Sequence, residues 1–160
     1  MRKWIFFLIL VILLALFQVT LLDYFKIFKV KPDLLLIGVV IASLIFDLRW
    51  SFILSILLGI FKDTFLVTTF GINTLLFPLC SFLIVKLSKE ITIDDNLMRL
   101  ALVFIVSIVH NTLTGLILIY LGNFIPLGIF LRTVFLSAVY TTAIFPLVIL
   151  AIRPLKFFNC

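Results

Sequence analysis

Long stretches without charge constrain what this chain can fold into more than any other feature of the sequence. Aspartate, glutamate, lysine and arginine make up 12% of the 160 residues, and hydrophobic residues make up 65%. The charge-free stretches cover residues 4–22, 34–46, 50–61, 64–85, 100–131 and 133–152. Because about 20 helical residues cross a bilayer core of about 30 Å, most of the chain can lie in a membrane. We therefore expect one integral membrane domain over residues 1–160.

The lengths of these stretches predict an all-α membrane protein with six transmembrane helices in one compact bundle. The expected spans cover residues 4–22, 33–47, 50–67, 71–87, 97–121 and 129–152. The first span follows a basic start, but it is longer than the apolar core of a typical signal peptide, and no small-residue cleavage site follows it. We therefore expect this segment to be retained as a span.

The middle of the chain allows two interpretations. Three crossings with tight turns fit between Pro32 and Leu87, and they place Lys62 and Asp63 inside the third span. In the alternative, Lys62 and Asp63 form a loop, and residues 50–61 form a half-span or a re-entrant segment. We favour the interpretation with six full spans.

Basic residues indicate the orientation of the chain. With six spans both termini share a side, and that side carries the basic residues of both termini, Arg49 and those of the loop at 86–99. The first loop on the opposite side contradicts this bias, because it contains Lys26, Lys29 and Lys31. Since cytoplasmic loops carry an excess of lysine and arginine, the sequence predicts a multi-pass protein of the cell membrane with both termini in the cytoplasm.

Several classes of function are excluded by what the sequence lacks. The formal net charge is +6, but lysines and arginines are scattered singly, which does not make a basic patch for nucleic acid. The two cysteines, Cys80 and Cys160, form neither a disulfide framework nor a metal-ligand spacing. There is also no glycine-rich phosphate loop and no catalytic set of serine, histidine and aspartate. We therefore expect no enzyme activity, no cofactor and no nucleic-acid partner.

A ridge of small and polar residues runs along the expected third span. Its members recur every four residues and share one face of a helix: Asp47, Ser51, Ser55, Gly59 and Asp63. Such ridges commonly pack against neighbouring helices in membranes, so we expect mainly helix packing here. Asp63 needs a partner from another span, because Lys62 points about 100° away from it around the helix. Arg132 of the sixth span lies at a similar expected depth, so we predict an ion pair between Asp63 and Arg132.

A second polar stripe lies on one face of the expected fifth span. It consists of Ser107, His110, Asn111 and Thr114. A proton relay through His110 would need other titratable groups around it, and the sequence offers no carboxylate at a comparable expected depth. We therefore expect a structural histidine. The side chains of the sixth span that we expect to bond to this stripe are Ser137, Tyr140 and Thr141.

Three short motifs stand out in the middle of the chain. They are KPDLLLI at residues 31–37, LGIFKDTF at 58–65 and FG at 70–71. These motifs resemble those of the MreD family of bacterial rod-shape-determining membrane proteins. The size of the chain, the expected six-span layout and the basic N-terminus agree with this family, so the resemblance covers nearly the whole chain. The sequence departs from the family pattern at 47–50, where DLRW replaces a glycine-rich turn, and at Lys62, where a neutral polar residue is more usual.

The resemblance implies a non-enzymatic scaffold of the cell-elongation machinery, which inserts peptidoglycan along the side wall and controls cell shape. The implied direct partner is MreC, a single-span protein with a large extracytoplasmic domain. The implied indirect partners are MreB filaments, RodA and the penicillin-binding partner of RodA. The family is also similar in fold to the substrate-binding subunits of energy-coupling-factor vitamin transporters, so such a subunit is the alternative function.

The candidate partner-binding or structural residues come from these motifs and from the predicted ion pair. They are Pro32, Asp33, Gly59, Asp63, Gly71 and Arg132. Pro32 fixes the backbone at a helix start, and Asp33 lies where the helix dipole favours a negative charge. The sequence is equally consistent with structural and binding roles for Pro32 and Asp33.

Overall fold

The structure, a computed structural model, describes residues 11–13, 16, 32–65, 71–90 and 96–152. Most of this part of the chain forms five long helices: α2 (Leu34–Ile45), α3 (Leu48–Phe65), α4 (Ile72–Glu90), α5 (Asn96–Tyr120) and α6 (Leu127–Ile152). Within the described ranges there is no strand, so the predicted all-α fold is confirmed. Most of the first expected span, 4–22, lies outside these ranges, and Lys26, Lys29 and Lys31 also lie outside them.

Three of the helices are long and apolar enough to cross a membrane. They are α4, α5 and α6, with apolar segments of 18, 25 and 24 residues. Helix α3 has 18 residues but contains Arg49, Lys62 and Asp63, and α2 has only 12 residues. Length and composition therefore indicate a membrane protein.

Helix α3 resolves the ambiguity in the middle of the sequence. It is continuous through Lys62 and Asp63, so the alternative in which these residues form a loop is wrong. Two residues connect it to α2, and the carbonyl of the second, Asp47, accepts a hydrogen bond from Ser51 N at 2.9 Å. A tight turn therefore forms here without the glycines that the family pattern has.

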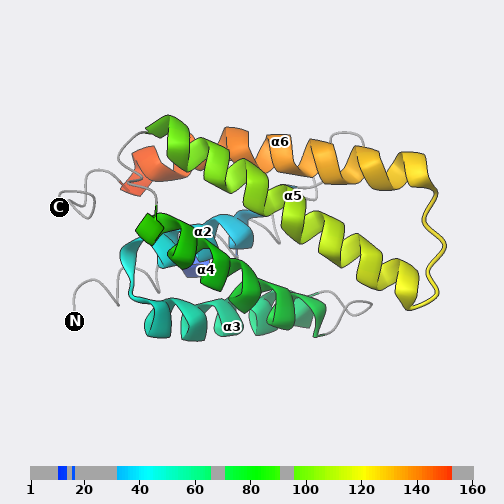
Figure 1. The fold of residues 1–160 in the computed structure, drawn as a ribbon, viewed down its shortest axis with the longest axis horizontal. Coiled ribbons are helices and arrows are strands. Elements are labelled where there is room, and N and C mark those ends of the chain that lie inside the picture. The colour runs from blue at the N-terminus through cyan, green and yellow to red at the C-terminus, as the bar shows by residue number, and fades with distance from the viewer. Residues whose placement is uncertain (1–10, 14–15, 17–31, 66–70, 91–95, 153–160) are drawn as a thin grey trace.

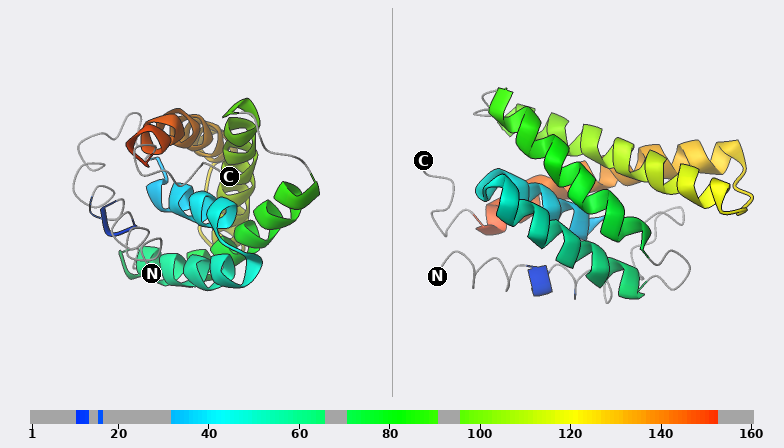
Figure 2. Two further views of the ribbon diagram at one scale, coloured as in Figure 1. Left: turned by 90° about the vertical axis from the view of Figure 1, so that its left-hand side faces the viewer. Right: turned by 60° about the horizontal axis from the view of Figure 1, so that its bottom comes forward.

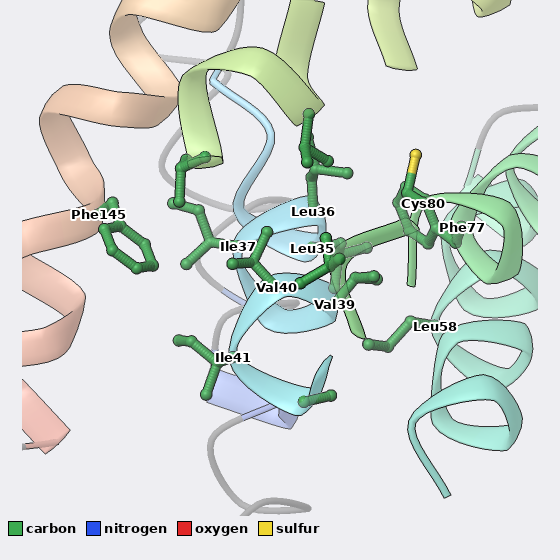
Figure 3. Packing of buried hydrophobic residues seen from close by; sticks show 14 of the residues in the cluster. Leu35, Leu36, Ile37, Val39, Val40, Ile41, Leu58, Phe77, Cys80 and Phe145 are labelled. Atoms are coloured by element: carbon green, nitrogen blue, oxygen red, sulfur yellow. The ribbon is translucent and has the colours of Figure 1, made fainter. Parts of the chain in front are cut away.

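Helix α2 occupies the middle of the bundle. All ten residues from Leu34 to Ser43 are buried, and ten consecutive residues cover every side of a helix. Figure 2 shows α2 with α3, α4, α5 and α6 arranged around it. The hydrophobic core forms around α2, and Figure 3 shows members of this cluster from several helices: Ile37 and Ile41 of α2, Leu58 of α3, Phe77 of α4 and Phe145 of α6. A helix that is apolar on all sides is stable only when it is enclosed in this way.

Helices α5 and α6 form an antiparallel hairpin that extends beyond the end of α3 (Figure 1). Helix α5 ends in a Schellman motif, in which Gly122 N donates to Ile119 O at 3.0 Å and Asn123 N donates to Leu118 O at 3.1 Å. The φ angle of Gly122 is 89°, in the region that favours glycine. The end of α5 is therefore sharply defined.

Candidate functional site

Asp33 lies at the N-terminus of α2, buried inside the bundle. Its Oδ1 accepts a hydrogen bond from Leu36 N at 3.2 Å, which makes Asp33 the N-cap of the helix. Its own backbone N donates to Thr141 Oγ1 of α6 at 3.1 Å. Pro32, directly before the cap, is also buried. Helix α2 therefore starts where the motif predicts a helix start, but it starts inside the protein and not at its surface.

Lys62 of α3 reaches into the same region. Its ammonium forms an ion pair with Asp33 Oδ2, and its side chain is 11% exposed. The Nζ atom also lies 3.4 Å from His110 Nε2 on α5 and 4.9 Å from the centre of the Phe77 ring on α4. An ammonium over an aromatic face gains a cation–π attraction. The cation therefore has contacts on three other helices.

Asp33, Lys62 and His110 form a group that we call the charged cluster. The imidazole of His110 is buried, and its Nε2 lies 3.6 Å from Asp33 Oδ2. The expectation that no carboxylate lies at the depth of His110 is wrong, because α2 begins inside the bundle and places Asp33 at that level. The sequence signal that points to this cluster is a lysine inside a span, since such a lysine needs a counter-charge.

Asp63 has a different set of partners from the lysine beside it. Its carboxylate accepts five hydrogen bonds of 2.6–3.2 Å, from the backbone of Gly71, Asn73 and Thr74 and from the side chains of Asn73 and Thr74. It thereby caps α4, whose first amides have no partner within the helix. The predicted ion pair between Asp63 and Arg132 is wrong: donors eight to eleven residues along the chain satisfy Asp63, and Arg132 is exposed on α6.

Gly71 gives the segment before α4 the shape that this cap requires. Its φ angle is 93°, a conformation that L side chains rarely adopt. In this conformation its backbone N donates to Asp63 Oδ2 at 3.0 Å. Gly71 therefore contributes through its backbone.

The ridge on α3 packs against α4, as its spacing predicts. The members of the ridge within α3 are buried, whereas Asp47, just before the helix, is exposed. A Cβ added at Gly59 would lie 2.6 Å from Thr74 Cα and 2.7 Å from Asn73 O, closer than a real Cβ approaches other atoms. Only glycine permits this contact between the two backbones.

Three buried serines form a hydroxyl cluster at the other end of the ridge. Ser51 Oγ of α3 lies 2.6 Å from Ser81 Oγ of α4 and 2.9 Å from Ser43 Oγ of α2. Ser43 Oγ and Ser81 Oγ are 3.0 Å apart. These hydrogen bonds satisfy the hydroxyls among apolar side chains and join the three helices.

The polar stripe on α5 is only partly satisfied. Thr114 Oγ1 donates to His110 O at 2.8 Å. The buried atoms Ser107 Oγ, His110 Nδ1 and Asn111 Nδ2 have no hydrogen-bond partner in the described part of the chain. The predicted bonds to α6 are therefore absent at these atoms. Thr141, one of the predicted partners, bonds to α2 instead.

The charged cluster connects α2, α3 and α5 through Asp33, Lys62 and His110. Asp33 and Lys62 neutralise each other, so the pair adds no net charge to the interior. Through Thr141, the same residues are also tied to α6. Within the described ranges, no group of three histidine, cysteine or acidic side chains is placed to hold a metal ion. The arrangement acts as a polar junction between helices.

Comparison with known proteins gives one match. The model of a protein family described as rod shape-determining protein MreD matches residues 1–155 of the chain. This match covers the motifs that contain Asp33, Asp63 and Gly71, and it confirms the resemblance inferred from them. No curated protein and no solved structure matches the chain.

Proposed function

Because the chain belongs to the MreD family of rod shape-determining proteins, we propose that it is a non-enzymatic membrane scaffold of the cell-elongation machinery. In this role it binds an MreC-like single-span protein. Through that partner it connects to MreB filaments, to RodA and to the penicillin-binding partner of RodA. The scaffold controls cell shape by holding side-wall peptidoglycan synthesis in place.

One observation supports a scaffold: most of the buried charged and polar groups of the described bundle bond to one another across helices. Asp33 pairs with Lys62, and Asp63 caps α4. Satisfied polar networks of this kind rigidify a fold, which suits a protein that presents a fixed surface to partners.

A specific observation favours the alternative, a substrate-binding subunit of an energy-coupling-factor vitamin transporter. The buried atoms Ser107 Oγ, His110 Nδ1 and Asn111 Nδ2 share one face of α5 and lack partners in the described part of the chain. A vitamin site needs converging polar groups of this kind, but it also needs an enclosed pocket. The fold likeness to such subunits stays a prediction.

We further propose six spans with both termini in the cytoplasm. Figure 1 shows the start of α3, the end of α4, the start of α5 and the end of α6 at the same end of the bundle. Arg49, Lys86, Lys89 and Arg99 belong to the first three of these helix ends, and such residues gather on the cytoplasmic side. Helix α2 has 12 residues and a length of about 18 Å, which is less than the thickness of a hydrocarbon core of about 30 Å.

The candidate residues divide by position. Those that are buried or bond to buried groups are Pro32, Asp33, Gly59, Asp63 and Gly71, whereas Arg132 is exposed on α6. We assign the first five to maintaining the bundle and Arg132 to the region where a partner binds.

Depletion of the protein in rod-shaped cells tests the scaffold. We expect the depleted cells to become round, and we expect an MreC-like protein to co-purify with the tagged chain in mild detergent. Normal cell shape together with loss of uptake of one vitamin, or co-purification of transporter ATPases, would contradict the scaffold and support the alternative.

A further inference from the structure

Three basic side chains lie at the end of the bundle where α3 begins and α4 ends (Figure 1). They are Arg49 of α3 and Lys86 and Lys89 of α4, and all three are exposed. No hydrogen bond or ion pair within the described part of the chain holds their charged groups. The acidic side chain that the structure describes at this end is Asp47, just before α3. The three cations therefore outnumber the described anion and lack a counter-charge from the protein.

The packing of α3 on α4 places these cations close to one another. Ser51 Oγ and Ser81 Oγ lie 2.6 Å apart, so the two serines are at one level. The helices run antiparallel (Figure 2), so both continue from this level toward the same end of the bundle: Arg49 lies about 3 Å beyond it and Lys86 about 7.5 Å beyond it. Lys89 follows about one turn later. Arginine and lysine have long stems that bring their charged groups to one level.

The lysines of α4 continue an exposed apolar stripe. Leu75, Leu79 and Phe82 are exposed, and with Lys86 and Lys89 they follow alternating spacings of four and three residues. This spacing places all five side chains on one face of the helix. Helix α4 is one of the three helices that can cross a membrane. The apolar part of this face therefore contacts acyl chains, and the two lysines lie at the level of the lipid headgroups.

Helix α3 shows the same arrangement beside it. Trp50 directly follows Arg49 and is 49% exposed, and Ile53 and Leu57 continue its face of the helix as exposed apolar side chains. Tryptophan is enriched where a membrane meets water, because its ring is apolar and its N–H is polar. The position of Trp50 therefore indicates the headgroup level independently of the charges.

We propose that Arg49, Lys86 and Lys89 bind the headgroup of an anionic phospholipid, whose acyl chains lie along the exposed faces of α3 and α4. Phosphate oxygens accept charge-assisted hydrogen bonds from guanidinium and ammonium groups. An anionic headgroup also supplies the net negative charge that these cations lack, whereas a zwitterionic headgroup carries a cation of its own. The inference depends neither on the proposed function nor on which side of the membrane this end of the bundle faces.

Tryptophan fluorescence in lipid vesicles tests the proposal, because Trp50 lies beside the proposed site. The chain contains two tryptophans, so the variant Trp4→Phe reports on Trp50 alone. Bromine atoms on acyl chains quench a tryptophan that they contact. The variant is reconstituted into mixtures of phosphatidylglycerol and phosphatidylcholine in which one lipid or the other is brominated. We expect phosphatidylglycerol to bind beside Trp50 about fivefold more tightly than phosphatidylcholine, and we expect this preference to weaken at high salt.

Two further variants in the Trp4→Phe background show whether the three cations cause the preference. R49Q/K86Q/K89Q should bind the two lipids equally, whereas R132Q, which removes a cation at the opposite end of the bundle, should keep the preference. The melting temperature of each variant in detergent checks that the bundle is intact. Equal quenching by the two brominated lipids before the cations are removed would overturn the proposal. A preference that survives in R49Q/K86Q/K89Q, or one that R132Q abolishes as well, would also overturn it.

Discussion

The ammonium of Lys62 pairs with the carboxylate of Asp33, which lies 29 residues earlier in the chain. Lys62 belongs to the last turn of α3, and Asp33 caps the start of α2. The pair therefore fixes the depth at which the central helix begins relative to the helix that follows it.

Removing only the cation of this pair should destabilise the protein more than neutralising both residues. The variant Lys62→Met leaves the Asp33 carboxylate buried without a cation, and we expect a loss of about 3–5 kcal/mol in the free energy of unfolding. The double variant D33N/K62M should recover most of this loss, because neither side chain is charged and asparagine still serves as an N-cap. Unfolding in mixed micelles with increasing SDS measures both.

Lys86→Met is the matched control, since Lys86 is exposed on α4. We expect its effect to stay within about 0.5 kcal/mol. Equal losses in the single and double variants would show that the charges of Asp33 and Lys62 do not interact.

Asp63 and Arg132 should respond independently to substitution. In Asp63→Asn, a neutral amide with one oxygen replaces a carboxylate that accepts five hydrogen bonds, so we expect a loss of at least about 2 kcal/mol. Arg132→Gln removes an exposed charge and should change stability by less than about 1 kcal/mol. The same unfolding assay compares them. If Arg132→Gln caused a large loss of stability in the wild-type chain but no further loss when added to Asp63→Asn, the ion pair between Asp63 and Arg132 would be supported after all.

Gly59→Ala should separate α3 from α4. The added Cβ meets backbone atoms of residues 73 and 74 at 2.6–2.9 Å, and backbone cannot move aside as a side chain can. We expect a loss of about 1–3 kcal/mol, typical of overpacking. Gly128→Ala on α6 is the control, because its Cβ would meet nothing within 4 Å. Equal melting temperatures for the two variants would contradict the close contact.

Gly71→Ala should destabilise the protein because of the backbone conformation alone. No atom lies within 4 Å of an added Cβ, but the φ angle of 93° is unfavourable for alanine. The expected loss is about 1–2 kcal/mol. Gly71→Asn should lose less, since asparagine tolerates positive φ better than alanine does. If alanine and asparagine behaved alike in thermal unfolding, the strain would not be the cause.

Local properties of the sequence predicted the helices well. Apolar length and helix-breaking residues are local, so the ranges expected for α3 to α6 differ from the observed helices by three residues or fewer at each end. The spacing from Ser51 to Asp63 also indicated the face of α3 that packs on α4, because a period of four places these residues on one side of the helix.

The charged cluster was not predictable in the same way. Its members are 29 and 48 residues apart, and their meeting depends on α2 beginning inside the bundle. The similar expected depth of Asp63 and Arg132 also led to the wrong partner for Asp63, because two residues at one depth meet only if their helices are neighbours and face each other. The donors that satisfy Asp63 belong to the start of the next helix, where unpaired amides attract a carboxylate.

Helix α2 is enclosed by α3, α4, α5 and α6, all of which are synthesised after it. As the ribosome delivers the chain, Asp33 meets its cation only when α3 has been inserted, and its backbone amide meets Thr141 only when α6 arrives. The central helix α2 is therefore synthesised early and is covered completely only when the last helix has been inserted. In a nascent chain arrested before α6, part of α2 would stay uncovered. Such a chain would be a target for the proteases that remove unfinished membrane proteins.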